Sequence, residues 1–195
     1  MARFIALEGG EAAGKSTQAY LLAEHLGAVL TREPGGTPIG EGLRRLLLDP
    51  NLPAPVPRAE ALLMLAARAE HVEKVIEPAL ARGQDVVCDR YSGSTLAYQG
   101  YGRGLGVADL ERINDWATSG RAPDITVLID VPPDIARSRR AGIGDRFEAE
   151  DDGFRLRVAK GFRELAAANP GRWRTVDGTA SVEDVAAEVR KAVEG

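Results

Sequence analysis

Cysteine is almost missing from this sequence, since Cys88 is the only one among 195 residues. No disulfide can form within the chain, and a reducing compartment, the cytoplasm, is the expected location. Long apolar runs are missing too: no stretch approaches the roughly twenty apolar residues that span a bilayer. Lysines are few, and 25 basic residues are outnumbered by 29 acidic ones. This balance excludes binding of nucleic-acid duplexes through a broad basic face, but a few arginines could still hold a small anion.

What the sequence does contain is a regular alternation of short apolar stretches and longer amphipathic ones, with 44% hydrophobic and 28% charged residues. The short stretches are rich in Val, Ile and Leu without strict alternation, which is typical of strands buried on both faces. Alternating strands and helices predict an α/β fold, a parallel sheet with helices on both sides. We find no linker within 1–195, so one domain is expected. The expected strands are 3–8, 28–32, 85–89, 124–131 and 173–177.

The longest amphipathic stretch covers residues 60–81. Leu62 and Leu65 begin an apolar stripe that recurs every three to four positions, so this stripe is predicted to face the core. Met64 and Arg68 share a face about a quarter turn from the stripe. Residues just beside a core stripe can line a cleft without leaving the helix.

Residues 137–152 are dense in charge and have almost nothing to bury. One interpretation is a solvated surface loop. The other is a mobile lid that brings Arg139, Arg140 and Arg146 over a bound phosphate. Composition favours neither.

A glycine-rich motif, GGEAAGKS, occupies residues 9–16 and matches the phosphate-binding pattern GxxxxGK[ST]. It follows an expected strand and opens an amphipathic helix, the order that this motif requires. Glycines let the backbone wrap tightly and point N–H groups at phosphate oxygens, and the helix N-terminus adds a favourable dipole. Lys15 would neutralise the terminal phosphates, and the Ser16 hydroxyl would bind Mg²⁺. The predicted ATP-binding segment is Gly9, Gly10, Glu11, Ala12, Ala13, Gly14, Lys15, Ser16 and Thr17.

Asp89 ends the expected strand 85–89 and is followed by Arg90. In a parallel sheet of this kind, a strand beside the phosphate loop supplies a carboxylate to the water shell of Mg²⁺, although such an aspartate can also simply cap the next turn. Arg90 falls at the sheet edge where ligands bind, and a guanidinium can grip a phosphate with two parallel hydrogen bonds. The Asn-Lys-x-Asp element of GTPases does not occur. The pattern therefore predicts a small-molecule phosphotransferase that uses MgATP and excludes water with a lid.

Further motifs, taken together with these, resemble one family: bacterial thymidylate kinase, which transfers the γ-phosphate of ATP to dTMP. The similarity covers nearly the whole chain, and the order and spacing of its pieces make it specific. These pieces are TREPGG at 31–36, LRRLLL at 43–48, AAR at 66–68, DRY at 89–91, AYQG at 97–100, GRG at 102–104 and DRFE at 145–148.

The resemblance implies a five-stranded parallel sheet in the order 2-3-1-4-5, an arginine-rich lid at about 137–152, and a homodimer joined through apolar helix faces. It implies direct in-line transfer without a covalent enzyme intermediate. The implied partners are ATP and dTMP, with Mg²⁺ as cofactor and with neither nucleic acid nor membrane. The residues implied in catalysis or metal binding are Lys15, Ser16, Asp89, Arg90, Arg140 and Arg146, with Arg139 on the ATP side.

The same resemblance assigns the acceptor side of the site. Arg44 and Arg90 would hold the acceptor phosphate, and Arg68 would hydrogen-bond the thymine edge. Glu11 would lie near the acceptor sugar and the phosphates, and Tyr98 would crowd the 2′ position and favour deoxyribose. The remaining implied positions are Glu33 and Pro34, which turn the chain beneath the base, Thr95 and Gln99, which complete base recognition, and Met64.

Met64 departs from the family pattern, which has an aromatic residue stacked on the pyrimidine. A thioether can cover a base face instead, or it can simply fill the core. His71 is expected on the surface or in helix packing, because phosphoryl transfer needs no histidine. Two other functions stay open: another nucleoside monophosphate or small-metabolite kinase, and a non-catalytic ATP-binding regulator.

Overall fold

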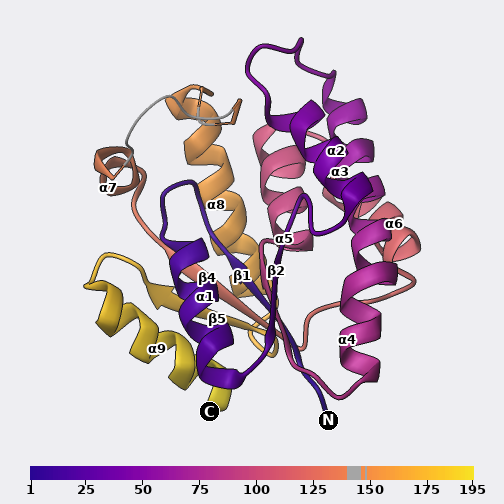
Figure 1. Cartoon of the computed structure of the whole chain (residues 1–195). Helices are drawn as coiled ribbons and strands as arrows, with labels where there is room; N and C mark the ends of the chain where they lie inside the picture. The colour runs from indigo at the N-terminus through magenta and orange to yellow at the C-terminus, as the bar shows by residue number, and fades with distance from the viewer. Residues whose placement is uncertain (140–145, 148) are drawn as a thin grey trace.

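The computed structural model describes residues 1–139, 146–147 and 149–195. At its centre is a five-stranded sheet in the order β2-β3-β1-β4-β5, in which all neighbouring strands are parallel (Figure 1). The predicted fold class and strand order are confirmed. The strands are β1 Phe4–Glu8, β2 Val29–Arg32, β3 Val86–Asp89, β4 Ile125–Asp130 and β5 Trp173–Asp177.

Helices cover both faces of this sheet, as the alternating pattern predicts. Among the described residues, none of these helices is both long and apolar enough to cross a membrane. The stretch expected at 60–81 is a continuous helical run made of α3, η1 and α4. The α-helices are α1 Lys15–Leu26, α2 Pro38–Leu48, α3 Pro57–His71, α4 Glu77–Ala81, α5 Ser92–Thr95, α6 Val107–Thr118, α7 Pro133–Ser138, α8 Asp152–Ala168 and α9 Val182–Glu194, and the π-helical segments are η1 Val72–Ile76 and η2 Leu96–Gly102.

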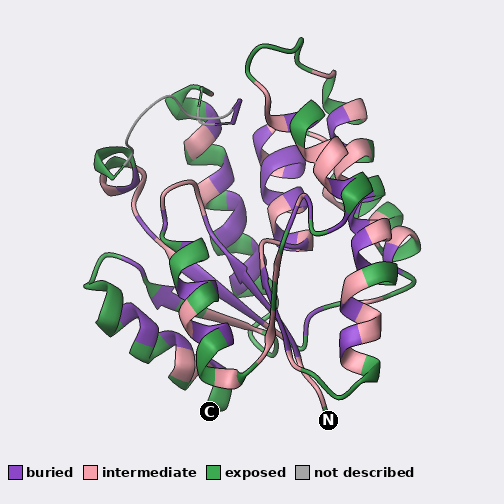
Figure 2. Ribbon diagram, viewed as in Figure 1, coloured by how far each residue is buried: buried purple, intermediate pink, exposed green. Residues whose placement is uncertain are grey.

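The core lies in layers on the two faces of the sheet. Helices α1 and α9 cover one face, where Leu22 and Val189 pack against Ile5 of β1. On the opposite face α8 and η2 form an aromatic cluster that includes Phe162, while η1 contributes Ile76 to a third cluster. Every residue of β1 is buried (Figure 2). Because β1 is covered on both faces, its carboxyl end is held firmly where the phosphate loop begins.

The register of the sheet gathers the functional strand ends. Leu7 of β1 pairs with Asp89 of β3, and Arg32 of β2 pairs with the same Asp89 from the other side. The residues after β1, β2 and β3 therefore leave the sheet at a common edge, which is where open α/β sheets bind ligands.

The predicted apolar stripe of α3 is buried at Leu65, which is 3% exposed, but not at its first member, and the helix also buries charged residues. Leu62, expected in the core, is 57% exposed, whereas Glu60 is 1% exposed, Arg68 3% and His71 0%. The surface placement of His71 is therefore wrong, and its packing inside the protein is confirmed. A buried helix face of charged residues is stable only when each charge finds a partner, and these partners belong to the site described below.

Candidate active site

A cavity of about 400 Å³ opens at the carboxyl ends of β1, β2 and β3. This volume falls in the range of small-molecule sites. The cavity joins the predicted ATP loop to the predicted acceptor residues. Those of the predicted site residues that line it are Glu11, Ala12, Gly14, Lys15, Ser16, Thr17, Glu33, Pro34, Arg44, Met64, Arg68, Asp89, Arg90, Thr95, Tyr98 and Gln99.

The phosphate loop is folded by its glycines. Gly9 has a φ of 146°, and a Cβ there would lie 2.5 Å from the carbonyl oxygen of Ile129, so only glycine fits. Gly14 has a φ of 87° and precedes the first turn of α1. The Nζ of Lys15 donates to the carbonyl oxygen of Gly10 at 2.6 Å. The loop thus wraps around its own lysine and leaves the N-terminus of α1 facing the cavity.

Lys15 is buried and carries an altered proton affinity. Burial, together with the nearby Arg90 guanidinium, lowers the pKa of Lys15 to about 8, although the carboxylates of Glu11 and Asp89 oppose this shift. A buried ammonium gains strongly from an anion placed beside it. A polyphosphate bound at this loop would therefore supply the counter-charge that Lys15 lacks.

Ser16 and Asp89 come together across the loop, as their predicted roles require. The Ser16 hydroxyl donates to Oδ2 of Asp89 at 2.5 Å. The other oxygen, Oδ1, is buried and has no hydrogen-bond partner among the residues that the structure describes. A hydroxyl and an unsatisfied carboxylate oxygen form a donor set for a hard cation, and Mg²⁺ keeps several waters beside one or two protein ligands. The residues present therefore fit Mg²⁺.

Arg90 reaches the cavity from a strained turn. Its φ of 72° is in the left-handed region, which side chains other than glycine rarely occupy. Its guanidinium donates to the carbonyl oxygen of Gly9 at 2.8 Å and to Oε1 of Glu11 at 2.6 Å. Burial disfavours the charge, but Glu11 raises the pKa of Arg90 above its ordinary value. The phosphate loop and Arg90 are thus joined by direct hydrogen bonds.

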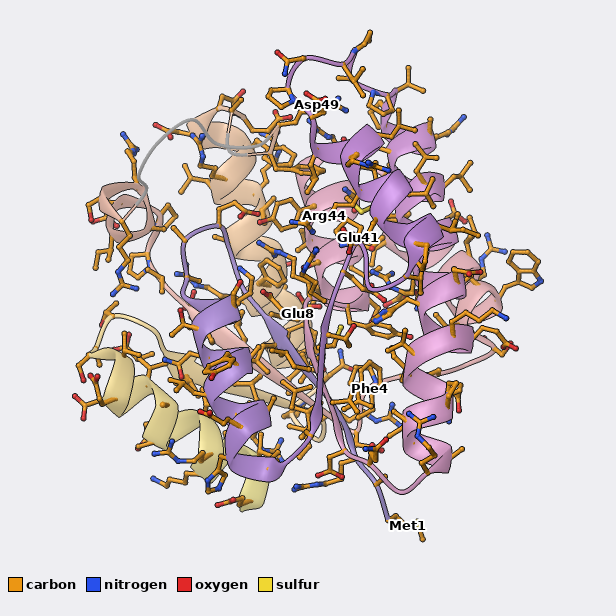
Figure 3. The ribbon with its side chains drawn as sticks, in the orientation of Figure 1. Met1, Phe4, Glu8, Glu41, Arg44 and Asp49 are labelled. Atoms are coloured by element: carbon orange, nitrogen blue, oxygen red, sulfur yellow. The ribbon has the colours of Figure 1, made fainter. Side chains whose placement is uncertain are left out.

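Glu8, which the sequence analysis did not assign, holds this turn in place. Its Oε1 accepts from the backbone N–H groups of Tyr91 and Ser94, both at 2.9 Å, and its Oε2 accepts from the Ser94 hydroxyl at 2.6 Å. Burial raises the pKa of Glu8 despite these bonds. The carboxylate at the end of β1 (labelled in Figure 3) therefore ties the start of the phosphate loop to the turn that carries Arg90.

Arg68 is fixed on several sides at the far end of the cavity. Its Nε donates to Oε2 of Glu33 at 2.7 Å and its Nη1 to Oδ1 of Asn114 at 2.7 Å. The ring of Tyr91 lies 4.9 Å from the guanidinium carbon, and Nδ1 of His71 bonds Oε1 of Glu33 at 2.9 Å. Burial opposes the charge of Arg68, but Glu33 raises its pKa. Arg68 is therefore positioned before any ligand binds.

The remaining acceptor residues surround the same space. Arg44 extends from α2 toward the middle of the molecule (labelled in Figure 3), where its Nη1 donates to the carbonyl oxygen of Pro34 at 2.9 Å. The Tyr98 hydroxyl donates to Oε1 of Glu11 at 2.7 Å, and burial raises the pKa of Tyr98. Met64 packs at the edge of the aromatic cluster and also lines the cavity, so both of its predicted roles are compatible with its place.

The lid arginines differ in their surroundings. Arg139 donates to the carbonyl oxygens of Gly178 and Thr179, at 2.8 and 3.2 Å, in the loop after β5. Arg146 donates instead to the carbonyl oxygens of Asp49 and Leu52, at 2.9 and 3.0 Å, and does not line the cavity. Arg140 lies outside the described residues. The catalytic roles of Arg140 and Arg146 stay predictions.

Sequence reasoning missed most of the groups that orient the binding residues. Glu8, Asn114 and His71 are far along the chain from the residues that they contact, and no local sequence pattern predicts such pairs. Glu60 did leave a signal, because it lies one helical turn before Met64 on the face of α3 that carries Arg68.

A phosphate loop after β1, a metal-competent pair and a cavity that extends to arginines on neighbouring elements define a P-loop phosphotransferase. A family model described as thymidylate kinase matches residues 7–189. The chain belongs to the thymidylate kinase family.

Sequences and a crystal structure of thymidylate kinases are similar to this chain over nearly its full length. The chain is 49% identical over 199 residues to a thymidylate kinase of Alkalilimnicola ehrlichii, covering 98% of this chain and 92% of that one. It is 51% identical over 199 residues to a thymidylate kinase of a Synechococcus species, covering 97% and 94%. The crystal structure of thymidylate kinase from Ehrlichia chaffeensis matches with a TM-score of 0.82 at 36% identity, covering 99% of both chains.

Proposed function

We propose that this chain transfers the γ-phosphate of MgATP to dTMP, giving ADP and dTDP. The observation that carries the proposal is that Lys15 and Ser16 line the same cavity of about 400 Å³ as Arg68 and Gln99. A donor and an acceptor held in one cavity can react directly, because their reacting oxygen and phosphorus are held close together. No covalent enzyme intermediate is needed.

On the donor side, the backbone N–H groups of residues 9–16 and the Lys15 ammonium bind the phosphates of ATP. Ser16 and Asp89 would hold Mg²⁺, which when bound offsets part of the phosphate charge. Arg139 and the loop after β5, joined by two hydrogen bonds, flank the adenine side.

On the acceptor side, Arg44 and Arg90 hold the phosphate of dTMP. An oxygen of this phosphate is already ionised near neutral pH, so the transfer demands no general base. As charge spreads over the oxygens of the transferring group, Lys15 and the arginines stabilise it. The lid, with Arg140 and Arg146, excludes water from the reaction.

The base and sugar are recognised deeper in the cavity. Arg68 donates to the thymine edge, with Thr95 and Gln99 beside it and Glu33 and Pro34 beneath. Met64 covers one face of the ring. Tyr98, fixed by Glu11 at 2.7 Å, occupies the space that a 2′-hydroxyl would need and so favours deoxyribose.

The proposal extends to a homodimer in the cytoplasm. Helices α3 and α6, which pack beside one another, leave Leu62 and Trp116 57% and 82% exposed. Covering such apolar side chains with a second copy is favourable. Analytical ultracentrifugation tests this, and Trp116→Glu should shift the protein to monomers. The single buried cysteine, Cys88, agrees with a reducing compartment.

A coupled assay of ADP release tests the reaction, with dTMP, dUMP, dCMP, CMP, UMP, AMP and GMP as acceptors. A preference for dTMP is expected. Preference for another acceptor would instead support a different nucleoside monophosphate kinase, and ATP binding without acceptor-dependent turnover would support a regulator.

A further inference from the structure

Glu60 is a charged residue that the mechanism does not use, and it is almost completely buried at 1% exposure. Its Oε1 accepts from Nε2 of Gln99 at 2.8 Å. Arg103 binds both oxygens of the carboxylate, with Nε at 3.1 Å and Nη2 at 3.0 Å. Burying a carboxylate is costly even when it is paired, so the contact with Gln99 invites a functional explanation.

The contact with Glu60 fixes which way the Gln99 amide faces. A carboxylate only accepts hydrogen bonds, whereas an amide donates through its nitrogen and accepts through its oxygen. The nitrogen of Gln99 must therefore face Glu60. The side-chain oxygen of Gln99, Oε1, has no hydrogen-bond partner among the described residues, and Gln99 lines the cavity. Gln99 thus offers the cavity an acceptor.

Arg68 offers the opposite polarity to the same cavity. Its Nε and Nη1 are already bonded to Glu33 and Asn114, which leaves Nη2 as a donor without a protein partner in the described part of the chain. A thymine or uracil edge carries a carbonyl acceptor beside an N–H donor. A cytosine edge carries an amino donor beside a bare nitrogen acceptor. The fixed donor of Arg68 and the fixed acceptor of Gln99 match the first edge and oppose the second.

We propose that Glu60 is a positioning residue that sets base specificity, since it orients Gln99 to accept a hydrogen bond from the imide N–H of thymine or uracil. The inference rests on the proposed function, because it assumes a pyrimidine nucleotide at this end of the cavity. Arg103 completes the arrangement by holding the charge of Glu60. Without that charge the side-chain amide of Gln99 can rotate by half a turn and direct its nitrogen toward the base.

The decisive variant is Glu60→Gln, which keeps the shape and removes the charge. Arg103 donates to both oxygen positions and its Nη2 also bonds Glu150, so the new amide can place either its oxygen or its nitrogen beside Gln99. Where the nitrogen stands there, Gln99 turns its own nitrogen to the cavity, and the orientation that suits cytosine becomes populated. The ratio of kcat/KM for dTMP to that for dCMP should fall by about ten-fold or more. The loss should appear in the KM for dTMP, with the KM for ATP unchanged.

Two further variants separate orientation from general damage. The double variant Glu60→Gln/Gln99→Glu puts an acceptor-only group beside the base and a donor behind it, so it should restore most of the ratio. Glu150→Gln is the matched control, because Glu150 bonds the same Nη2 of Arg103 at 2.6 Å but has no bond to Gln99. It should leave the ratio unchanged.

The outcomes distinguish this inference from the proposed function. If the unaltered protein does not prefer dTMP over dCMP, both fail. If it does, and Glu60→Gln keeps the full ratio or Glu150→Gln lowers it equally, only the role of Glu60 is overturned.

A measurement on the unaltered protein covers the case in which Glu60→Gln does not fold. The side-chain amide protons of Gln99 are followed by NMR and assigned by comparison with Gln99→Glu. We expect one slowly exchanging proton in the free protein, unchanged by dTMP. A proton that becomes protected only when dTMP binds would mean that the nitrogen faces the base, and it would overturn the proposal.

Discussion

The two ends of the cavity are built in different ways. The proposed donor end is built mainly from one chain segment, residues 9–17, of which Lys15 and Ser16 line the cavity, with Asp89 added from β3. The base end is assembled from separate elements: Arg68 comes from α3, Gln99 from η2 and Asn114 from α6. Phosphate charge is the same in every nucleotide, so a loop of N–H groups suffices to bind it. Telling bases apart requires donors and acceptors whose directions are fixed, and this takes several elements.

The same contrast holds for the charges before any ligand arrives. Lys15 is buried without a full counter-charge, and its pKa is lowered to about 8. Arg68 is buried against Glu33, and its pKa is raised. In the proposed function, Lys15 would gain its counter-charge from ATP, whereas the charge of Arg68 is already balanced by Glu33 within the protein.

The largest expected effect is that of Lys15→Ala at the donor end. Turnover should fall by about a hundred-fold or more, because a charge that stabilises the transferring phosphoryl group is removed. The fold should persist, since no buried partner loses an ion pair. Steady-state kinetics and circular dichroism measure the two effects, and a comparable kcat in a folded protein would contradict the assigned role.

At the base end, Arg68→Ala should affect both binding and stability. The KM for dTMP should rise by about ten-fold or more, and that for ATP should change little. The free energy of unfolding should fall by roughly 3 kcal/mol, because Glu33 is left buried without its cation.

Denaturant titration and kinetics on Arg68→Ala/Glu33→Gln provide the control. This pair should recover stability without recovering the KM for dTMP. Equal effects on the two substrates would place the pyrimidine elsewhere.

The lowered pKa of Lys15 predicts how ATP binding depends on pH. The free protein holds the Lys15 charge below a pH of about 8 and loses it above that value. ATP favours the charged form, so it should bind more weakly as pH rises through this range, and binding there should take up a proton.

Isothermal titration calorimetry in buffers of different ionisation enthalpy measures that proton. The dTMP-binding end, where the pKa of Arg68 is raised, should show no such uptake from Arg68. Absence of proton uptake with ATP near pH 8 would argue against a weakly compensated Lys15.

The smallest effect is expected for Met64→Phe. An aromatic ring in place of the thioether should leave dTMP binding unchanged or tighten it by less than about ten-fold, since such contacts contribute little beyond burial. Equilibrium binding of dTMP measures this. A large loss in a protein that still unfolds cooperatively would mean that Met64 does not face the base.

The fold and the donor end were predictable because their signals are local. Apolar runs predict buried strands, and residues 9–16 carry their chemistry in one contiguous motif. The strand order and the acceptor residues came from the resemblance to thymidylate kinases.

On α3, local reasoning predicted that Met64 and Arg68 line a cleft, and both line the cavity, but it did not predict which charged residues are buried. Apolar periodicity predicts that Leu62 faces the core. The structure instead leaves Leu62 exposed and buries Glu60, Arg68 and His71. Their partners lie 35 to 46 residues away along the chain. Arg68, for example, bonds both Glu33 and Asn114. Only the folded chain reveals that these charges are paired.

The most direct test of the account is a crystal structure with a nonhydrolysable ATP analogue and dTMP bound together. We expect the analogue's phosphates against the backbone N–H groups of residues 9–16 and Lys15, and the thymine carbonyl on Arg68 at the other end of the same cavity. Phosphates bound away from this loop, or a thymine outside the cavity, would contradict it.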